Sequence, residues 1–160
     1  RWVPAEHEDS NEKLIRETLL TGAAGAAEFL PFYAPDVSVE DRCVELNDEI
    51  RTVPFPFAVS LLGMGADGHF ASLFPDAANL EDGLDTESHN MCIPVTTDAS
   101  PYARISLTLS ALSRSHEIVL LFFGDDKRAV YETARDGDRQ LPVSALLRQK
   151  RAPVHVYWAP

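Results

Sequence analysis

The stretch Phe57-Ala-Val-Ser-Leu-Leu-Gly-Met-Gly-Ala-Asp-Gly-His-Phe-Ala-Ser-Leu-Phe-Pro75 decides the fold of this chain. Its first part, residues 57–62, is an apolar run that predicts a buried strand. The run stops at a loop that contains Gly63, Gly65 and Gly68, and glycine lets backbone and ligand approach closely because it has no Cβ. In α/β folds such loops lie at the carboxyl edge of the sheet, where ligands bind. The stretch therefore predicts an α/β fold with a ligand site at the end of this strand.

Asp67 and His69 stand in the same loop, with only Gly68 between them. An imidazole beside a carboxylate supplies a general base and a group that orients it. Taken alone, an Asp in a glycine loop is more often a turn residue, and a single His is more often a surface or core group. Their placement together at the carboxyl end of a strand favours function. We therefore predict that His69 and Asp67 are catalytic residues.

The bulk properties of the chain limit its class. A length of 160 residues predicts a single domain over residues 1–160. The formal net charge of −11 argues against nucleic acid and against an anionic membrane surface as partners. A small anionic substrate is compatible with that charge if a few cations gather in one cleft. The sequence leaves the oligomeric state open between a monomer and a homodimer.

Cysteine and histidine usage indicates a chain without a structural metal or a disulfide scaffold. Cys43 and Cys92 form no C-x-x-C pattern, so we expect reduced thiols in a cytoplasmic protein. No histidine has ligand spacing relative to His69, and H-E-x-x-H is absent. We therefore expect no metal and no cofactor.

Apolar periodicity predicts alternating strands and helices. The expected strands are residues 57–62, 91–95, 104–109, 117–123 and 154–158, and the expected helices are residues 11–20, 38–51, 125–135 and 141–149. Asp9 with Glu12 fits a capping box for the first helix, and Asp125 is the expected N-cap of the third. Residues 76–90 carry no period and are expected to be a surface loop. The alternation predicts an α/β domain with a largely parallel, Rossmann-like sheet flanked by helices.

The loop from Gly63 to Gly68 formally matches the dinucleotide-binding pattern G-x-G-x-x-G. That pattern also needs a helix that opens at the loop and an acidic residue about 20 positions further on. Pro75 follows too soon for a full crossover helix. We therefore disfavour a dinucleotide site.

Three cations stand near predicted strand ends or turns: Arg1, Arg104 and Lys127. The usual role of such residues is a solvated surface charge. Lys127 is the most suggestive, because a helix N-terminus with an added ammonium makes a phosphate site. Arg128 is an alternative for the cation at this place.

The residues just described resemble the 6-phosphogluconolactonase family. The segment from Leu62 to Pro75 is similar to its signature loop, and this part of the resemblance is highly specific. Weaker matches follow in the order of the family: Arg1-Trp-Val-Pro4, Arg104-Ile-Ser-Leu-Thr108, Gly124-Asp-Asp-Lys127, Leu141-Pro-Val-Ser144 and residues 154–158. The resemblance covers nearly the whole chain and departs from the family at Ala58 and after Trp158.

The resemblance implies the fold shared with glucosamine-6-phosphate deaminase and ribose-5-phosphate isomerase. It also implies an N-terminal part of that fold that residues 1–160 do not include. It implies a metal-independent hydrolase of 6-phospho-D-glucono-1,5-lactone in the oxidative pentose phosphate pathway, with His69 as the base and Asp67 beside it. In that reading Arg104 and Lys127 bind the substrate phosphate, Arg1 lines the same cleft, and the loop glycines contact the substrate.

Two other readings stay open. One is an aminosugar-phosphate deaminase or isomerase of the same superfamily, although the deaminases follow the loop His with a segment that contains Asn and Glu. Here that segment is Phe70-Ala-Ser-Leu-Phe-Pro75. The other is a non-catalytic sugar-phosphate sensor, which would not need His69.

Overall fold

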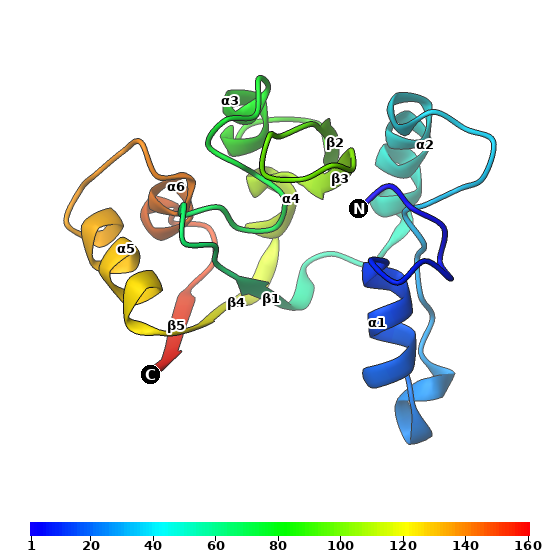
Figure 1. Cartoon of the computed structure of the whole chain (residues 1–160), viewed down its shortest axis with the longest axis horizontal. Coiled ribbons are helices and arrows are strands. Elements are labelled where there is room, and N and C mark those ends of the chain that lie inside the picture. Colours follow the sequence, from blue (N-terminus) through cyan, green and yellow to red (C-terminus); the bar gives the residue numbers. More distant parts are fainter.

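A computed structural model describes residues 1–160 and contains a central sheet of three parallel strands (Figure 1). The strands are β1 (Phe57–Gly63), β4 (Ser115–Phe123) and β5 (Val154–Ala159), in the order β1-β4-β5. Gly63 at the end of β1 pairs with Leu121 near the end of β4. The carboxyl ends of these two strands therefore meet at one edge of the sheet, as the sequence predicts.

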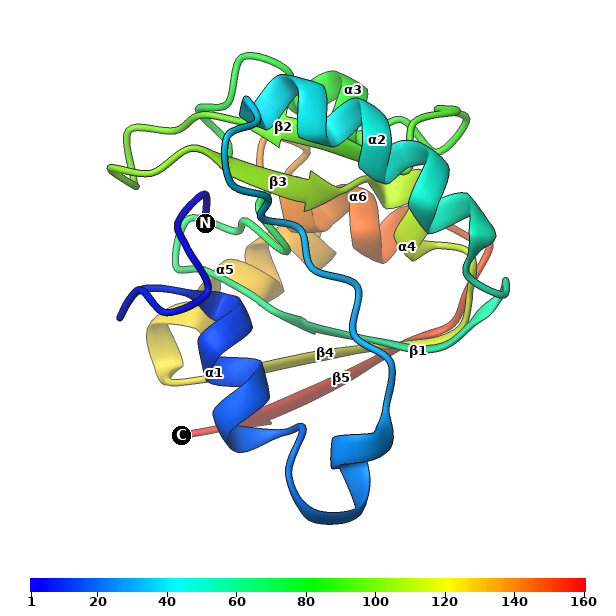
Figure 2. The ribbon, with the colours of Figure 1, turned by 90° about the vertical axis from the view of Figure 1, so that its right-hand side faces the viewer.

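Helices cover one face of this sheet (Figure 2). They are α4 (Leu109–Leu112), α5 (Asp125–Arg135) and α6 (Pro142–Arg148). Burial alternates along β4, so Ile118, Leu120 and Phe122 point into the main core. This alternation follows from the strand period of two and places every second side chain under the helices.

The opposite face of the sheet carries no helix below β4 and β5 in Figure 1. Apolar side chains from all three strands are exposed on it: Val59, Leu61, Leu121, Phe123 and Tyr157. The prediction that residues 57–62 and 117–123 are buried strands was therefore wrong for one of their two faces. Parallel strands are apolar on both sides because both faces are normally covered. On this face the side chains of β4 and β5 stay exposed, and only at β1 do Val59 and Leu61 border a cavity that the N-terminal segment also lines.

A second layer lies beyond the helices in Figure 2. There β2 (Cys92–Val95) and β3 (Arg104–Leu107) form an antiparallel pair, and α2 (Val39–Thr52) packs on it with one apolar side. The Asn47 side chain joins α2 to β2, because its amide donates to the Cys92 carbonyl (3.0 Å) and its oxygen accepts from the Met91 N–H (2.5 Å). Cys43 and Cys92 are buried free thiols at this junction, with their sulfur atoms 3.4 Å apart.

Several predicted boundaries need correction. Helix α1 (Asn11–Thr18) is capped by Ser10 rather than by Asp9, because the Ser10 hydroxyl accepts from the Lys13 N–H. At the start of α5 the N-cap is Gly124 (φ 89°), and Asp125 is already in the first turn. The expected loop at residues 76–90 contains the short helix α3 (Leu80–Leu84). The sequence does not predict α3, because a helix of five residues is too short to show an apolar period.

Two further segments differ in detail from the predicted elements. The strand expected at residues 104–109 ends at Leu107, since α4 begins at Leu109. A 3-10 helix, η1 (Gly22–Ala26), follows α1. No helix combines the length and the apolar character needed to cross a membrane.

Candidate functional site

The glycine loop leaves β1 at the carboxyl edge of the sheet, and buried apolar residues that follow it anchor it in the core. Phe70 and Leu73 are fully buried, and isolated bridges join Phe70 to Met64 and to Leu73. The turn itself closes through the Gly65 N–H, which donates to the His69 carbonyl at 2.9 Å. The apolar residues thus anchor the loop in the core, and the polar residues between them stay at the surface.

Asp67 and His69 form the pair that the sequence predicts. Their side chains meet at 2.6 Å between Asp67 Oδ1 and His69 Nδ1, and Asp67 Oδ1 also accepts from the His69 backbone N–H at 3.2 Å. A carboxylate only accepts, so this contact places the proton on Nδ1 and leaves the lone pair of Nε2 free. The His69 side chain is 28 % exposed, so Nε2 is able to take a proton from a bound molecule.

Gly65 makes room for this pair. A Cβ at position 65 would lie 2.2 Å from His69 Nδ1 and 2.4 Å from Asp67 Oδ1. Both distances are far below van der Waals contact, so any side chain there would separate the carboxylate from the imidazole. The glycine is therefore required by the close approach of two side chains.

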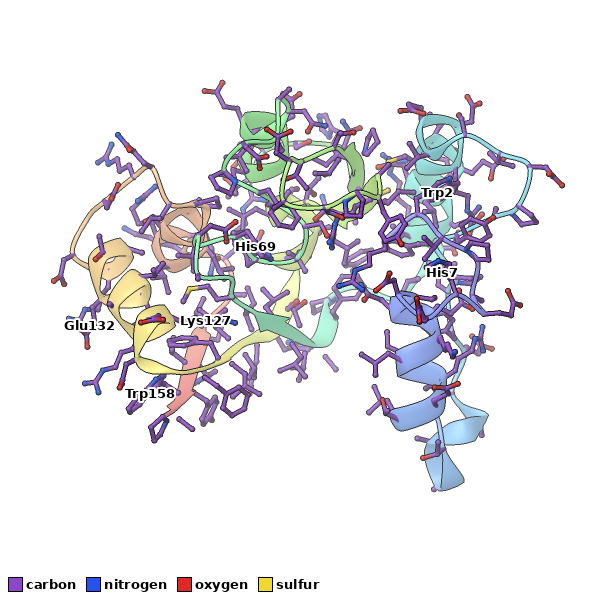
Figure 3. All side chains as sticks on the ribbon, viewed as in Figure 1. Trp2, His7, His69, Lys127, Glu132 and Trp158 are labelled. Atoms are coloured by element: carbon purple, nitrogen blue, oxygen red, sulfur yellow. The ribbon has the colours of Figure 1, made fainter.

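A cavity of about 310 Å³ lies beside the imidazole. Its lining includes Gly63, Gly65, His69, Ala71 and Lys127. Lys127 comes from the first turn of α5, which follows β4 at the same edge of the sheet. Figure 3 shows His69 and Lys127 near each other, with Trp2 and His7 on the far side of β1. The cavity therefore brings a free imidazole nitrogen and an ammonium group to one space.

Arg128, the alternative cation, is directed elsewhere. Its guanidinium pairs with Glu132 at 3.0 Å and lies 4.5 Å from the ring centroid of Trp158. It does not line the cavity beside His69. Of these two neighbouring cations, Lys127 is therefore the one that faces the site.

Arg104 adjoins the site through an aromatic ring. Its guanidinium carbon lies 5.1 Å from the ring centroid of Phe74, and the same ring stacks on the His69 imidazole at 4.0 Å. Arg104 Nε is buried and has no hydrogen-bond partner. Burial, and then repulsion from Arg1, lowers the pKa of the Arg104 guanidinium below its usual value. The Arg104 guanidinium forms no ion pair with an acidic side chain, which favours an anionic ligand there.

Arg1 lies in a second, larger cavity of about 600 Å³. The two cavities share Leu61, Leu62 and Ala71 as a common wall, so they are neighbours. Arg1 already pairs with Asp9 at 3.1 Å. The structure thus places His69, Asp67 and Lys127 together and Arg1 in the neighbouring cavity. Arg104 lines neither cavity and adjoins the site only through Phe74.

Comparisons with known proteins identify the family of this site. Residues 1–158 match the family model described as glucosamine-6-phosphate isomerases/6-phosphogluconolactonase. The chain belongs to this family. Within it, the 6-phosphogluconolactonase of Caulobacter vibrioides is 43 % identical over 99 % of this chain, and that of Pseudomonas putida is 39 % identical over 100 %.

A solved structure of the family has the same fold. The crystal structure of a 6-phosphogluconolactonase from Shewanella baltica superposes with a TM-score of 0.92 at 36 % identity and covers 100 % of this chain. The chain spans 68 % and 65 % of the two curated relatives and 69 % of that solved chain. It therefore corresponds to about two thirds of the length of the family members it matches.

The three loop glycines lie at different places relative to the cavities. Gly63 and Gly65 line the cavity beside His69, but Gly68 lies outside the lining of both cavities. Gly68 has φ 78°, its carbonyl accepts from the Val143 N–H at 2.9 Å, and a Cβ there would meet Leu141 at 3.1 Å. Its function is therefore to let the loop turn and dock on α6.

Sequence reasoning missed two residues of the site. Ala71 lines both cavities and has φ 50°, a left-handed conformation that non-glycine residues seldom adopt. Phe74 contacts both His69 and Arg104. Both residues stand in the family signature stretch, but an apolar residue in an apolar run looks like core, so its type alone carries no functional signal. No group of three or more His, Cys, Asp or Glu side chains in residues 1–160 is arranged to hold a metal ion.

Proposed function

We propose that this protein hydrolyses 6-phospho-D-glucono-1,5-lactone to 6-phospho-D-gluconate in the oxidative pentose phosphate pathway. The observation that carries the proposal is the 2.6 Å contact between His69 Nδ1 and Asp67, beside a cavity that Lys127 also lines. Family membership and the names of the matched relatives point to the same reaction. They favour the lactonase over the deaminase or sensor readings.

In the proposed reaction His69 is the general base. Its Nε2 takes a proton from water as the water oxygen attacks the C1 carbonyl of the lactone. The tetrahedral intermediate then collapses, the bond between C1 and the ring oxygen breaks, and the imidazolium returns the proton to that oxygen. Positioned proton transfer of this kind contributes about 10²- to 10⁴-fold in rate.

Asp67 keeps the imidazole in the reactive tautomer and stabilises the imidazolium that forms during attack. A six-membered lactone is an activated ester, so this chemistry needs no covalent nucleophile, and we propose that it needs no metal. Backbone N–H groups of the glycine loop are candidates for binding the developing oxyanion at C1.

Lys127 and Arg104 are the proposed ligands of the substrate phosphate, with Arg1 in the adjoining cavity. Charge-assisted hydrogen bonds to phosphate fix the far end of the substrate and so orient C1 toward the base. A net charge of −11 is compatible with a small anionic substrate, because only the few cations at the site have to face it. We also propose a cytoplasmic location, which the two free thiols support.

The test is lactone hydrolysis, followed by proton release above the spontaneous rate. In the full-length protein, His69→Ala should lose most of kcat at neutral pH and keep its affinity for 6-phosphogluconate. The matched control is His89→Ala, which removes an exposed imidazole outside the site. Equal turnover in His69→Ala and in the wild-type enzyme would refute the role of His69.

A further inference from the structure

The ring of Phe74 contacts two groups of the proposed site. It is 3 % exposed and stacks on the His69 imidazole, with ring centroids 4.0 Å apart and planes inclined by 29°. The Arg104 guanidinium carbon lies 5.1 Å from the centroid of the same ring. One buried side chain thus touches both the base and a cation.

The contact with His69 complements the bond to Asp67. A hydrogen bond at Nδ1 fixes one edge of the imidazole but leaves the tilt of its plane free about that bond. A face-to-face aromatic neighbour restrains that tilt. Together the two contacts determine where Nε2 points.

The contact of Phe74 with Arg104 stabilises a guanidinium whose buried Nε has no hydrogen-bond partner. Arg104 Nε is buried without a hydrogen bond, and none of the ion pairs in the structure includes Arg104. A desolvated guanidinium over an aromatic face is stabilised by the ring quadrupole. An aliphatic side chain of similar volume would fill the space without this attraction.

We propose that Phe74 is a positioning residue that holds the His69 imidazole and the Arg104 guanidinium at a fixed separation. The inference rests on the proposed lactone hydrolysis, because the base and the phosphate ligand must reach opposite ends of one substrate. Phe74 acts through these two residues and takes no part in the bond changes of the reaction.

The test replaces the aromatic ring and keeps the core filled. The variants are Phe74→Leu and Phe74→Met in the full-length enzyme. The matched control is Phe122→Leu, which removes a buried ring from the same core. The Phe122 ring packs on Tyr131, with centroids 5.6 Å apart, and lines neither site cavity.

We expect both Phe74 variants to lower kcat by about 10- to 100-fold, because small displacements of a base are costly. The Kd of 6-phosphogluconate should rise by about 3- to 30-fold as the Arg104 guanidinium loses its aromatic contact. Phe122→Leu should lower the melting temperature to a similar degree and leave kcat and Kd unchanged. The proposal is overturned if kcat or Kd in the Phe74 variants matches that control.

A readout that does not depend on turnover separates this inference from the proposed function. The His69 Nδ1–H, held by Asp67, should give a sharp downfield proton signal in NMR spectra of the wild-type protein. That signal should broaden or vanish in Phe74→Leu and persist in Phe122→Leu. A sharp signal in Phe74→Leu overturns the positioning role even if the wild-type enzyme hydrolyses the lactone. A wild-type enzyme without lactonase activity refutes the proposed function, and the NMR comparison still decides the role of Phe74.

Discussion

Gly65 is the residue on which the geometry of the Asp67–His69 pair most directly depends. The space that a Cβ would occupy is taken by His69 Nδ1 at 2.2 Å and by Asp67 Oδ1 at 2.4 Å. The neighbouring Gly68 serves the backbone instead, since its positive φ turns the chain. Two glycines of one loop are therefore required for different physical reasons.

We expect Gly65→Ala to disrupt the pair while the core stays folded. The added methyl group must push the imidazole away from the carboxylate, so kcat should fall by about 100-fold or more. The control is Gly25→Ala, whose Cβ would meet only the Leu20 carbonyl oxygen at an ordinary 3.6 Å. Steady-state kinetics with a parallel melting curve checks the result, and unchanged kcat in Gly65→Ala would contradict the steric argument.

Lys127→Ala tests the ammonium in the cavity. Loss of a charge-assisted contact to phosphate should raise KM for the lactone by about 10- to 100-fold. Arg128→Ala is the control, because it removes the neighbouring cation that pairs with Glu132 outside the cavity. If the two variants had the same KM, Lys127 would not be a phosphate ligand.

At the scale of elements, the end of the glycine loop is fastened to the layer above it. Thr97, just beyond β2, donates from its hydroxyl to Asp76 at 2.7 Å, and the Asp98 N–H donates to the same carboxylate at 2.7 Å. The hydrogen bond from Thr97, and to a smaller extent that from the Asp98 N–H, holds the pKa of Asp76 below its usual value. The loop that carries His69 is thus anchored by the core at its centre and by Asp76 at its far end.

The Asp76 anchor predicts a pH dependence of stability. A carboxyl group whose pKa is lowered by folding stabilises the folded state above its unfolded pKa, about 3.9 for Asp. That contribution to stability is lost as the pH falls through the lower pKa that the carboxyl group has in the folded state. Asp76→Asn should therefore melt below the wild-type protein at neutral pH, and the difference should shrink to zero in acid.

Melting curves between neutral and strongly acidic pH check this prediction. Asp82→Asn is the control, since Asp82 is an exposed carboxylate in α3 without a hydrogen bond or ion pair. A difference between Asp76→Asn and the wild-type protein that stays constant with pH would show that the carboxylate charge plays no part.

At the scale of the whole molecule, the central sheet is covered on one side only. Leu61, Phe123 and Tyr157 are 68 %, 61 % and 58 % exposed on the open face. A contiguous apolar surface on a parallel sheet is typical of a face made to be covered. The chain spans 68 % and 65 % of the lengths of the two curated relatives.

We expect the polypeptide of residues 1–160, produced by itself, to self-associate through this face. The double variant Phe123→Gln, Tyr157→Gln should lower the association measured by sedimentation velocity. Leu19→Gln is the control, because Leu19 is 66 % exposed and is the C-cap of α1 rather than a residue of the three strands. Association that is unaffected by the double variant would mean that another surface is responsible.

Local signals in the sequence predicted most elements but not all their boundaries. The apolar runs at residues 57–62 and 117–123 mark β1 and β4 correctly, because strand periodicity and β-propensity are properties of a few neighbouring residues. The sequence predicts a cap of α1 at Asp9, whereas the structure has Ser10 there, because both residue types cap helices. Only the contacts of Asp9 with Arg1 and Tyr102 show that its side chain is engaged elsewhere.

The sequence by itself determined the α/β class and the proximity of Asp67 to His69, because strand and helix patterns and a two-residue spacing depend on residues that are close in the chain. Only the tertiary structure decided that Lys127 shares a cavity with His69 and that Phe74 joins His69 to Arg104. It also decided that one face of the sheet is open. Such contacts join segments far apart in sequence, and packing in three dimensions selects them from many that local patterns allow equally.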